Sequence, residues 1–95
     1  MILIKDDEFI RGNCPMTEDI RALSIWKMNL KENSTVLDVG SGTGTITVQA
    51  SKISSNGVVY SIERDEDAIS TTKINLDKFD CTNVILDEGD AVEIL

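Results

Sequence analysis

A chain of 95 residues has room for one small domain, and its 41% of apolar residues is enough for a globular core. The formal net charge of −8 opposes binding to nucleic acid or to an anionic membrane surface, because both require a basic face on the protein. Histidine is absent, which excludes histidine-dependent catalytic triads and most zinc sites, so we expect no metal centre.

The N-terminal residues 1–16 show no sustained apolar period and contain the only proline, so they are predicted to form an arm or loop. Thr17 is a candidate helix N-cap, because two acidic residues follow it in what would be the first turn. The apolar residues that recur at helical spacing are Ile20, Leu23 and Trp26. This helix is expected to end within residues 29–33.

Short buried strands are predicted to alternate with helices in the rest of the chain. The strands are expected at 35–39, 58–62 and 83–86, and the helices at 45–53 and after the N-cap Asp65, broken by residues 80–82. Residues 54–57 are expected to form a turn, and 87–91 a polar loop. This order predicts a parallel, right-handed βαβαβ unit that binds ligands at the carboxyl ends of its strands.

Polar residues and glycines gather where these strands end. Residues 38–44 follow the first strand, Glu63 ends the second, and residues 89–91 follow the third. Because the carboxyl ends of parallel strands meet at one edge of a sheet, this clustering is the main indication of a site.

The stretch VLDVGSGTGTITV contains glycines at positions 40, 42 and 44. A phosphate-binding P-loop requires a lysine and a hydroxyl residue after its last glycine, whereas Thr45 and Ile46 follow here. The dinucleotide fingerprint G-x-G-x-x-G fits poorly, because the third glycine comes one residue early. A pyrophosphate is therefore possible but not well matched.

The arrangement D-x-G-x-G-x-G resembles that of class I S-adenosylmethionine (SAM) methyltransferases. Glycines without Cβ let the methionyl part and the ribose lie against the main chain, and the following helix offers N–H groups to a carboxylate. The acid before the loop can fix its amides or accept a hydrogen bond from the ligand's ammonium. The alternative is a tight turn without a ligand. The candidate cofactor contacts in this stretch are Asp38, Gly40, Ser41, Gly42, Thr43 and Gly44.

Two further candidate contacts follow the later strands. Glu63 lies about 20 residues after the last glycine, where a carboxylate can take both ribose hydroxyls, although a solvated acid in a charged segment is the alternative. In methyltransferases of this class, an acid at Asp90 accepts from the adenine amino group and the backbone N–H of Ala91 reaches a ring nitrogen. The alternative there is a simple acidic turn.

The segments DDEFIRGNCPMT, SIERDEDAISTTKINLDKF and NVILDEGDA narrow the resemblance. Together with the glycine loop they look like the CbiT family, the cobalt-precorrin (or precorrin) C15-methyltransferases that also decarboxylate an acetate side chain in cobalamin synthesis. The resemblance implies a Rossmann-like α/β fold, SAM as cofactor and a tetrapyrrole substrate. It also implies that Thr17 lies over the cofactor; helix capping alone is the alternative for this residue.

The family's domain is roughly twice as long as this chain. We therefore expect residues 1–95 to be its N-terminal, cofactor-binding part, either a fragment or a remnant, with the C-terminal half absent. That half would supply most of the tetrapyrrole pocket and most of the cationic contacts to this polycarboxylate substrate. On the arm, the only cationic candidates for such contacts are Lys5 and Arg11. No catalytic residue is assigned, because in-line methyl transfer depends on positioning rather than on an acid or base.

Two other functions stay open: an RNA or protein methyltransferase of the same fold, and a non-catalytic SAM- or nucleotide-binding half-domain. The two cysteines, Cys14 and Cys81, lie outside any CxxC pattern and are expected to be reduced. The first residues are not those of a signal peptide, and no apolar run is long enough to cross a bilayer. We therefore expect a cytoplasmic protein, and the negative charge predicts no nucleic-acid or membrane partner. A three-strand piece of the sheet would leave an edge and an apolar face bare, so we expect a homo-oligomer.

Overall fold

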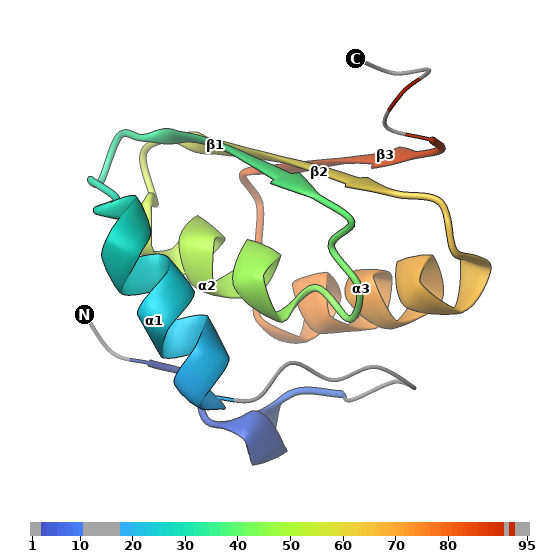
Figure 1. Ribbon diagram of the computed structural model, residues 1–95, viewed down its shortest axis with the longest axis horizontal. Helices are drawn as coiled ribbons and strands as arrows, with labels where there is room; N and C mark the ends of the chain where they lie inside the picture. The colour runs from blue at the N-terminus through green and yellow to red at the C-terminus, as the bar shows by residue number, and fades with distance from the viewer. Residues whose placement is uncertain (1–2, 11–17, 91, 93–95) are drawn as a thin grey trace.

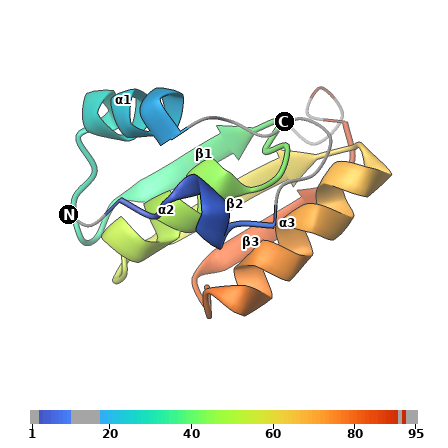
Figure 2. The ribbon, with the colours of Figure 1, turned by 90° about the horizontal axis from the view of Figure 1, so that it is seen from below.

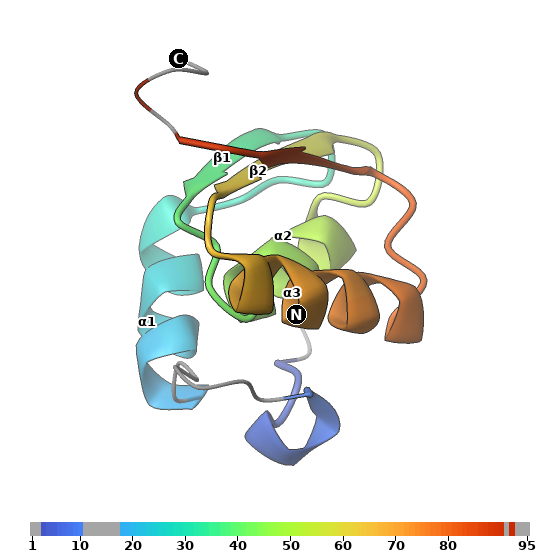
Figure 3. The same ribbon diagram turned by 90° about the vertical axis from the view of Figure 1, so that its right-hand side faces the viewer.

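Three parallel strands form one sheet, and in the described part of the chain the helices lie on one side of it (Figure 1). The computed structural model describes residues 3–10, 18–90 and 92. Helices lie below the sheet and the described part of the N-terminal arm lies on their far side, so that the molecule is layered (Figures 1 and 3). None of the helices in these residues is long and apolar enough to cross a membrane.

The strands are β1 (Thr35–Val39), β2 (Val58–Glu63) and β3 (Val84–Glu88), in the order β1-β2-β3. Both pairings are parallel, which confirms the parallel βαβαβ arrangement. The expected end of β3 at residue 86 is wrong. Asp87 and Glu88, expected in a polar loop, lie opposite the last two residues of β2, because backbone pairing with a longer neighbour extends the strand whatever its side chains.

The helices are α1 (Glu18–Met28), α2 (Thr45–Ile53) and α3 (Glu66–Lys78). The range expected for α2 is confirmed. Asp65 is also confirmed as the N-cap of α3, because its carboxylate accepts a hydrogen bond of 2.9 Å from Ala68 N. The arm contains a single turn of 3-10 helix, η1 (Asp6–Glu8), which crosses below α2 between α1 and α3 (Figure 2).

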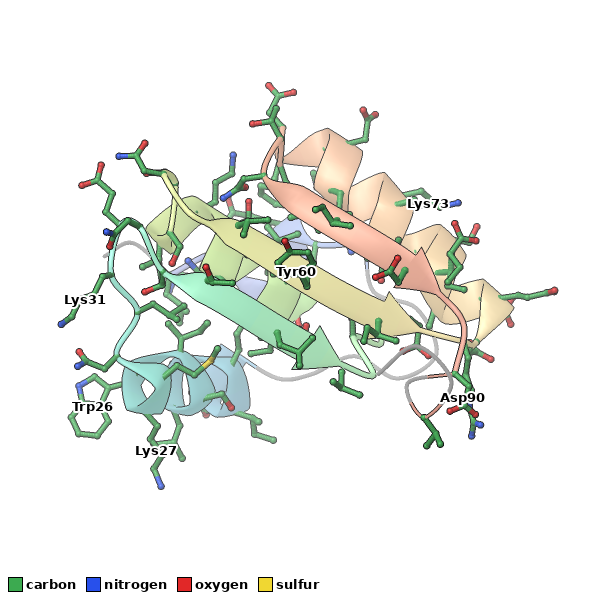
Figure 4. The ribbon with its side chains drawn as sticks, turned by 90° about the horizontal axis from the view of Figure 1, so that it is seen from above. Trp26, Lys27, Lys31, Tyr60, Lys73 and Asp90 are labelled. Atoms are coloured by element: carbon green, nitrogen blue, oxygen red, sulfur yellow. The ribbon has the colours of Figure 1, made fainter. Side chains whose placement is uncertain are left out.

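The buried face of helix α1 includes a charged residue, whereas several of its large apolar side chains are exposed. Arg21 and Ile25 are 0% and 2% exposed, and the Arg21 guanidinium lies 4.7 Å from the centre of the Phe9 ring on the arm. The three residues whose spacing predicted the helix are all exposed: Ile20 by 56%, Leu23 by 56% and Trp26 by 72%. Trp26 projects away from the sheet (Figure 4). The spacing therefore predicted the helix but not the side on which it packs.

The core lies between the sheet and the helices. Its central cluster consists of Ile25, Val36, Ala50 and Val59. The strand β1 is buried on one face only, because alternate residues of a strand point to opposite faces and the described helices lie on one side of the sheet. Leu37 is 53% exposed, and on the same face of the sheet Tyr60 is visible from above (Figure 4).

Candidate cofactor site

The loop between β1 and α2 has two kinds of glycine. Gly40, Gly42 and Gly44 all have positive φ, at 71°, 59° and 83°, which favours glycine at each position. A Cβ on Gly40 or Gly42 would meet nothing within 4 Å, whereas one on Gly44 would lie 2.9 Å from Thr72 Cγ2 on α3. The first two glycines thus leave open space on the outer side of the loop, and the third allows α3 to pack against it.

Most loop amides are held by the neighbouring strand. Gly40 N and Ser41 N donate to Ile62 O at 2.8 and 3.3 Å, and Gly42 N donates to Glu63 Oε1 at 2.8 Å. Gly44 N closes a turn with Ser41 O at 2.9 Å. Within the described residues, the buried Ser41 Oγ has no hydrogen-bond partner. The loop is therefore built before any ligand is bound, with a polar group left over.

Asp38 lies within β1 and faces α2. Its Oδ2 accepts a hydrogen bond of 2.6 Å from Thr47 Oγ1. Burial raises the pKa of the Asp38 carboxyl above its ordinary value; the Thr47 hydrogen bond opposes this shift and the nearby charge of Glu63 adds to it. Two roles were considered for Asp38: to hold the loop amides or to accept from the ligand's ammonium. Glu63, and not Asp38, accepts the hydrogen bond from the loop amide of Gly42. The ammonium contact is therefore the role of Asp38 that remains a prediction.

Glu63 connects the end of β2 to the loop. Besides Gly42 N, its carboxylate accepts from Arg64 N at 2.9 Å and from Asp65 N at 3.1 Å. Burial would raise the pKa of this carboxyl, but the three backbone N–H groups and the Arg64 charge together lower it. Glu63 is therefore held ionised at the centre of the site.

Asp90 is bound by its neighbours. Its Oδ2 lies 3.0 Å from Arg64 Nη1, and its Oδ1 accepts from Val92 N at 2.9 Å. A cleft of about 330 Å³ opens at this edge of the sheet, within the size range of small-molecule sites. The residues that line it are Val39, Gly40, Ile62, Glu63, Arg64, Gly89, Asp90 and Val92. The structure thus brings the ends of all three strands together, as expected.

Two of the candidate residues, Thr17 and Ala91, lie outside the described residues, and their contacts stay predictions. Three side chains that shape the site were not predicted from the sequence. They are Thr47, which bonds to Asp38, and Thr72 and Asn75 of α3, which bond to Gly42 O and Thr43 O. The available signal was a pair of polar residues three positions apart on a helix face that is otherwise apolar.

This combination of a parallel sheet, a glycine loop and a carboxylate at the next strand end defines a known class. A family model described as a methyltransferase domain matches residues 30–95, and the chain belongs to that family. The chain is 45% identical over 95 residues to the probable cobalt-precorrin-6B C(15)-methyltransferase (decarboxylating) of Sulfurisphaera tokodaii, covering 97% of this chain and 50% of the relative. The resemblance inferred from sequence is confirmed.

Solved structures agree with this assignment. The precorrin-6y C5,15-methyltransferase of Geobacter metallireducens superposes with a TM-score of 0.90 at 31% identity, over 97% of this chain and 50% of that one. TYW2 of M. jannaschii in complex with AdoMet gives 0.65 at 28% identity, over 75% and 32%. The expected Rossmann-like fold is confirmed, and the chain spans about half the length of its precorrin-related relatives.

Proposed function

We propose that this chain is the cofactor-binding part of a SAM-dependent methyltransferase that methylates C15 of a cobalt-precorrin-6B-type tetrapyrrole and removes the neighbouring acetate carboxyl group. The observation that carries the proposal is the open outer side of the glycine loop beside Glu63 and Asp90, in a chain 45% identical to a relative of that name. When bound, S-adenosylmethionine supplies the methyl group.

The residues present fit this cofactor. Gly40 and Gly42 admit the ligand where any Cβ would project into its space, and the ionised Glu63 suits the two ribose hydroxyls. Asp38 suits the ammonium, and Asp90 the adenine amino group after exchange of its bond to Arg64. The full proposed set of cofactor contacts is Thr17, Asp38, Gly40, Ser41, Gly42, Thr43, Gly44, Glu63, Asp90 and Ala91.

The tetrapyrrole pocket is proposed to lie mostly in the part of the relatives that this chain does not cover. No residue is assigned as acid or base, because these residues act by binding and orienting the cofactor. Self-association is also part of the proposal, since the uncovered face of the sheet carries exposed apolar side chains. They are Leu37, Val39, Tyr60 and Ile85. A cytoplasmic location accords with the biosynthetic role.

Calorimetry with S-adenosylhomocysteine and NAD tests the cofactor assignment. S-adenosylhomocysteine is expected to bind tighter, because the third glycine comes too early for a pyrophosphate loop. Tighter binding of NAD would overturn the proposal. Sedimentation of the same sample tests self-association, and a monomer at all concentrations would remove that part.

A further inference from the structure

Helix α3 places two fully buried polar side chains directly below the glycine loop. Thr72 and Asn75 are both 0% exposed and lie three positions apart, on one face of the helix. Thr72 Oγ1 donates to Gly42 O at 2.8 Å, and Asn75 Nδ2 donates to Thr43 O at 2.9 Å. The helix thus binds two consecutive carbonyl groups of the loop.

These two bonds fix which way the loop amides point. In a trans peptide the C=O and N–H groups point in opposite directions, so carbonyls turned toward α3 direct the next N–H groups away from it. The amide after Thr43 is used in the turn to Ser41 O, at 2.9 Å. The Thr43 N–H, which shares a peptide group with Gly42 O, is thereby directed away from α3.

Asn75 also holds the N-terminal arm. Its Oδ1 accepts from Ile10 N at 2.8 Å, and its Nδ2 donates to Ile10 O at 2.9 Å as well as to Thr43 O. A carboxamide has two N–H hydrogens, so its donor capacity is divided between one arm residue and one loop residue. Ile10 directly precedes residues 11–17, the segment that contains Thr17.

Other contacts hold the arm without reaching the loop. Gln49 Oε1 on α2 accepts from Ile4 N at 2.8 Å, and the Arg21 guanidinium on α1 donates to Ile4 O. Lys78 Nζ, at the end of α3, donates to Glu8 O. These bonds attach the arm to the helices, whereas the bonds of Asn75 connect it to the glycine loop itself.

We propose that Asn75 is a positioning residue of the cofactor site, which couples the N-terminal arm to the glycine loop so that order in one requires order in the other. The inference rests on the proposed function in assigning the loop to a cofactor. The coupling itself is a property of the ligand-free protein. Removal of the carboxamide leaves the buried Thr43 O without this partner, and it removes both hydrogen bonds that attach the backbone of Ile10, at a more exposed position, to the helix. Both segments then lose this attachment.

The first experiment compares Asn75→Ala with Asn83→Ala. Asn83 is a matched control, because its Nδ2 also donates to several carbonyl groups, those of Ser51, Ser54 and Gly57, and none of these bonds reaches the described part of the arm or the glycine loop. We expect Asn75→Ala to lower the affinity for S-adenosylhomocysteine at least tenfold and Asn83→Ala to change it less than twofold. Equal affinities of the two folded variants would overturn the proposal.

The second experiment uses amide hydrogen exchange without ligand, and surface variants that leave the core intact. Lys78→Met releases the arm at Glu8, whereas Lys73→Met, on the same helix, breaks only an exposed ion pair with Glu88. We expect Lys78→Met to speed exchange in residues 3–10 and, through Asn75, in residues 42–44, with no change in Lys73→Met. Faster exchange in the arm with an unchanged loop would refute the coupling.

The two experiments separate this inference from the proposed function. If the parent chain binds no S-adenosylhomocysteine but exchange in arm and loop changes together, the cofactor assignment fails and the coupling stands. If the parent binds the ligand and the exchange of the two segments is independent, the coupling fails and the cofactor assignment stands.

Discussion

The two sides of the glycine loop differ in what occupies them. The side toward α3 is closed: Thr72 and Asn75 bind its carbonyls, and Gly44 lies against Thr72 with no space for a methyl group. The outer side is open, because a Cβ on Gly40 or Gly42 would meet no atom within 4 Å. Glycine therefore allows close packing at position 44 and leaves open space at positions 40 and 42. Substitutions at these positions can separate the effect on packing from the effect on ligand binding.

Gly44→Ala is expected to have the largest effect, and on stability. Its Cβ would approach Thr72 Cγ2 to 2.9 Å and the Thr72 Cα to 3.1 Å, and its φ of 83° disfavours alanine. Overpacking against a backbone atom together with backbone strain costs about 2–4 kcal/mol of unfolding free energy. Urea denaturation measures it. A loss below about 1 kcal/mol would show that α3 can move away from the loop.

Glu63→Ala comes next and acts on both stability and binding. Removal of a charged acceptor from the ribose hydroxyls should lower the affinity for S-adenosylhomocysteine about tenfold or more. Glu88→Ala is the control, because Glu88 lies opposite Glu63 in the sheet but pairs with Lys73 outside the cleft. Calorimetry on both variants decides, and equal affinities would mean that Glu63 serves only the backbone.

Gly42→Ala should separate the open side from the closed one. With no atom within 4 Å of the new methyl group, the cost in stability is the strain of φ 59° alone, about 1 kcal/mol. The methyl group projects into the proposed ligand space, so the loss in binding free energy should exceed the loss in unfolding free energy. Comparison with Gly44→Ala by denaturation and calorimetry tests this. The opposite order of effects would place the ligand elsewhere.

Sequence predicted the parts of this site that depend on local signals. The β-branched run of β1 and the glycines that follow it gave the bounds of β1 and α2, and the Asp65 cap gave the start of α3. The roles of Thr72 and Asn75 depend on partners 30 to 65 residues away and on which helix lies below the loop. The exposure of Trp26 likewise depends on what surrounds α1, which spacing cannot indicate.

The end of β3 shows the same limit on a smaller scale. The acids at positions 87 and 88 are typical of a loop, and a strand forms there only because the parallel neighbour offers backbone partners. The end of β3 was therefore predicted less well than the end of β1, although both lie at the edge of the sheet that carries the candidate site.

Asp38→Asn should have the smallest effect, with opposite signs on stability and binding. Because burial, followed by the weaker influence of Glu63, raises the pKa of Asp38 in the folded state, the ionised carboxylate lowers stability at neutral pH. This cost begins to fall as the pH drops through the raised pKa, and it is gone below the ordinary pKa of an aspartate. The asparagine variant, which can still accept from Thr47 Oγ1, should be as stable as the parent or more so at neutral pH. Its affinity for S-adenosylhomocysteine should fall a few-fold, since the ammonium loses its carboxylate partner.

The pH dependence of binding sharpens this last test. A bound cation favours the ionised form of Asp38, so the parent should lose affinity as the pH falls through the raised pKa of that group. Glu63 loses its charge only at lower pH, because its pKa is lowered, and so its protonation does not overlap the first step. In Asp38→Asn the first step should be absent from calorimetric titrations across that range. A parent affinity that rises on acidification would contradict the assignment of Asp38 to the ammonium.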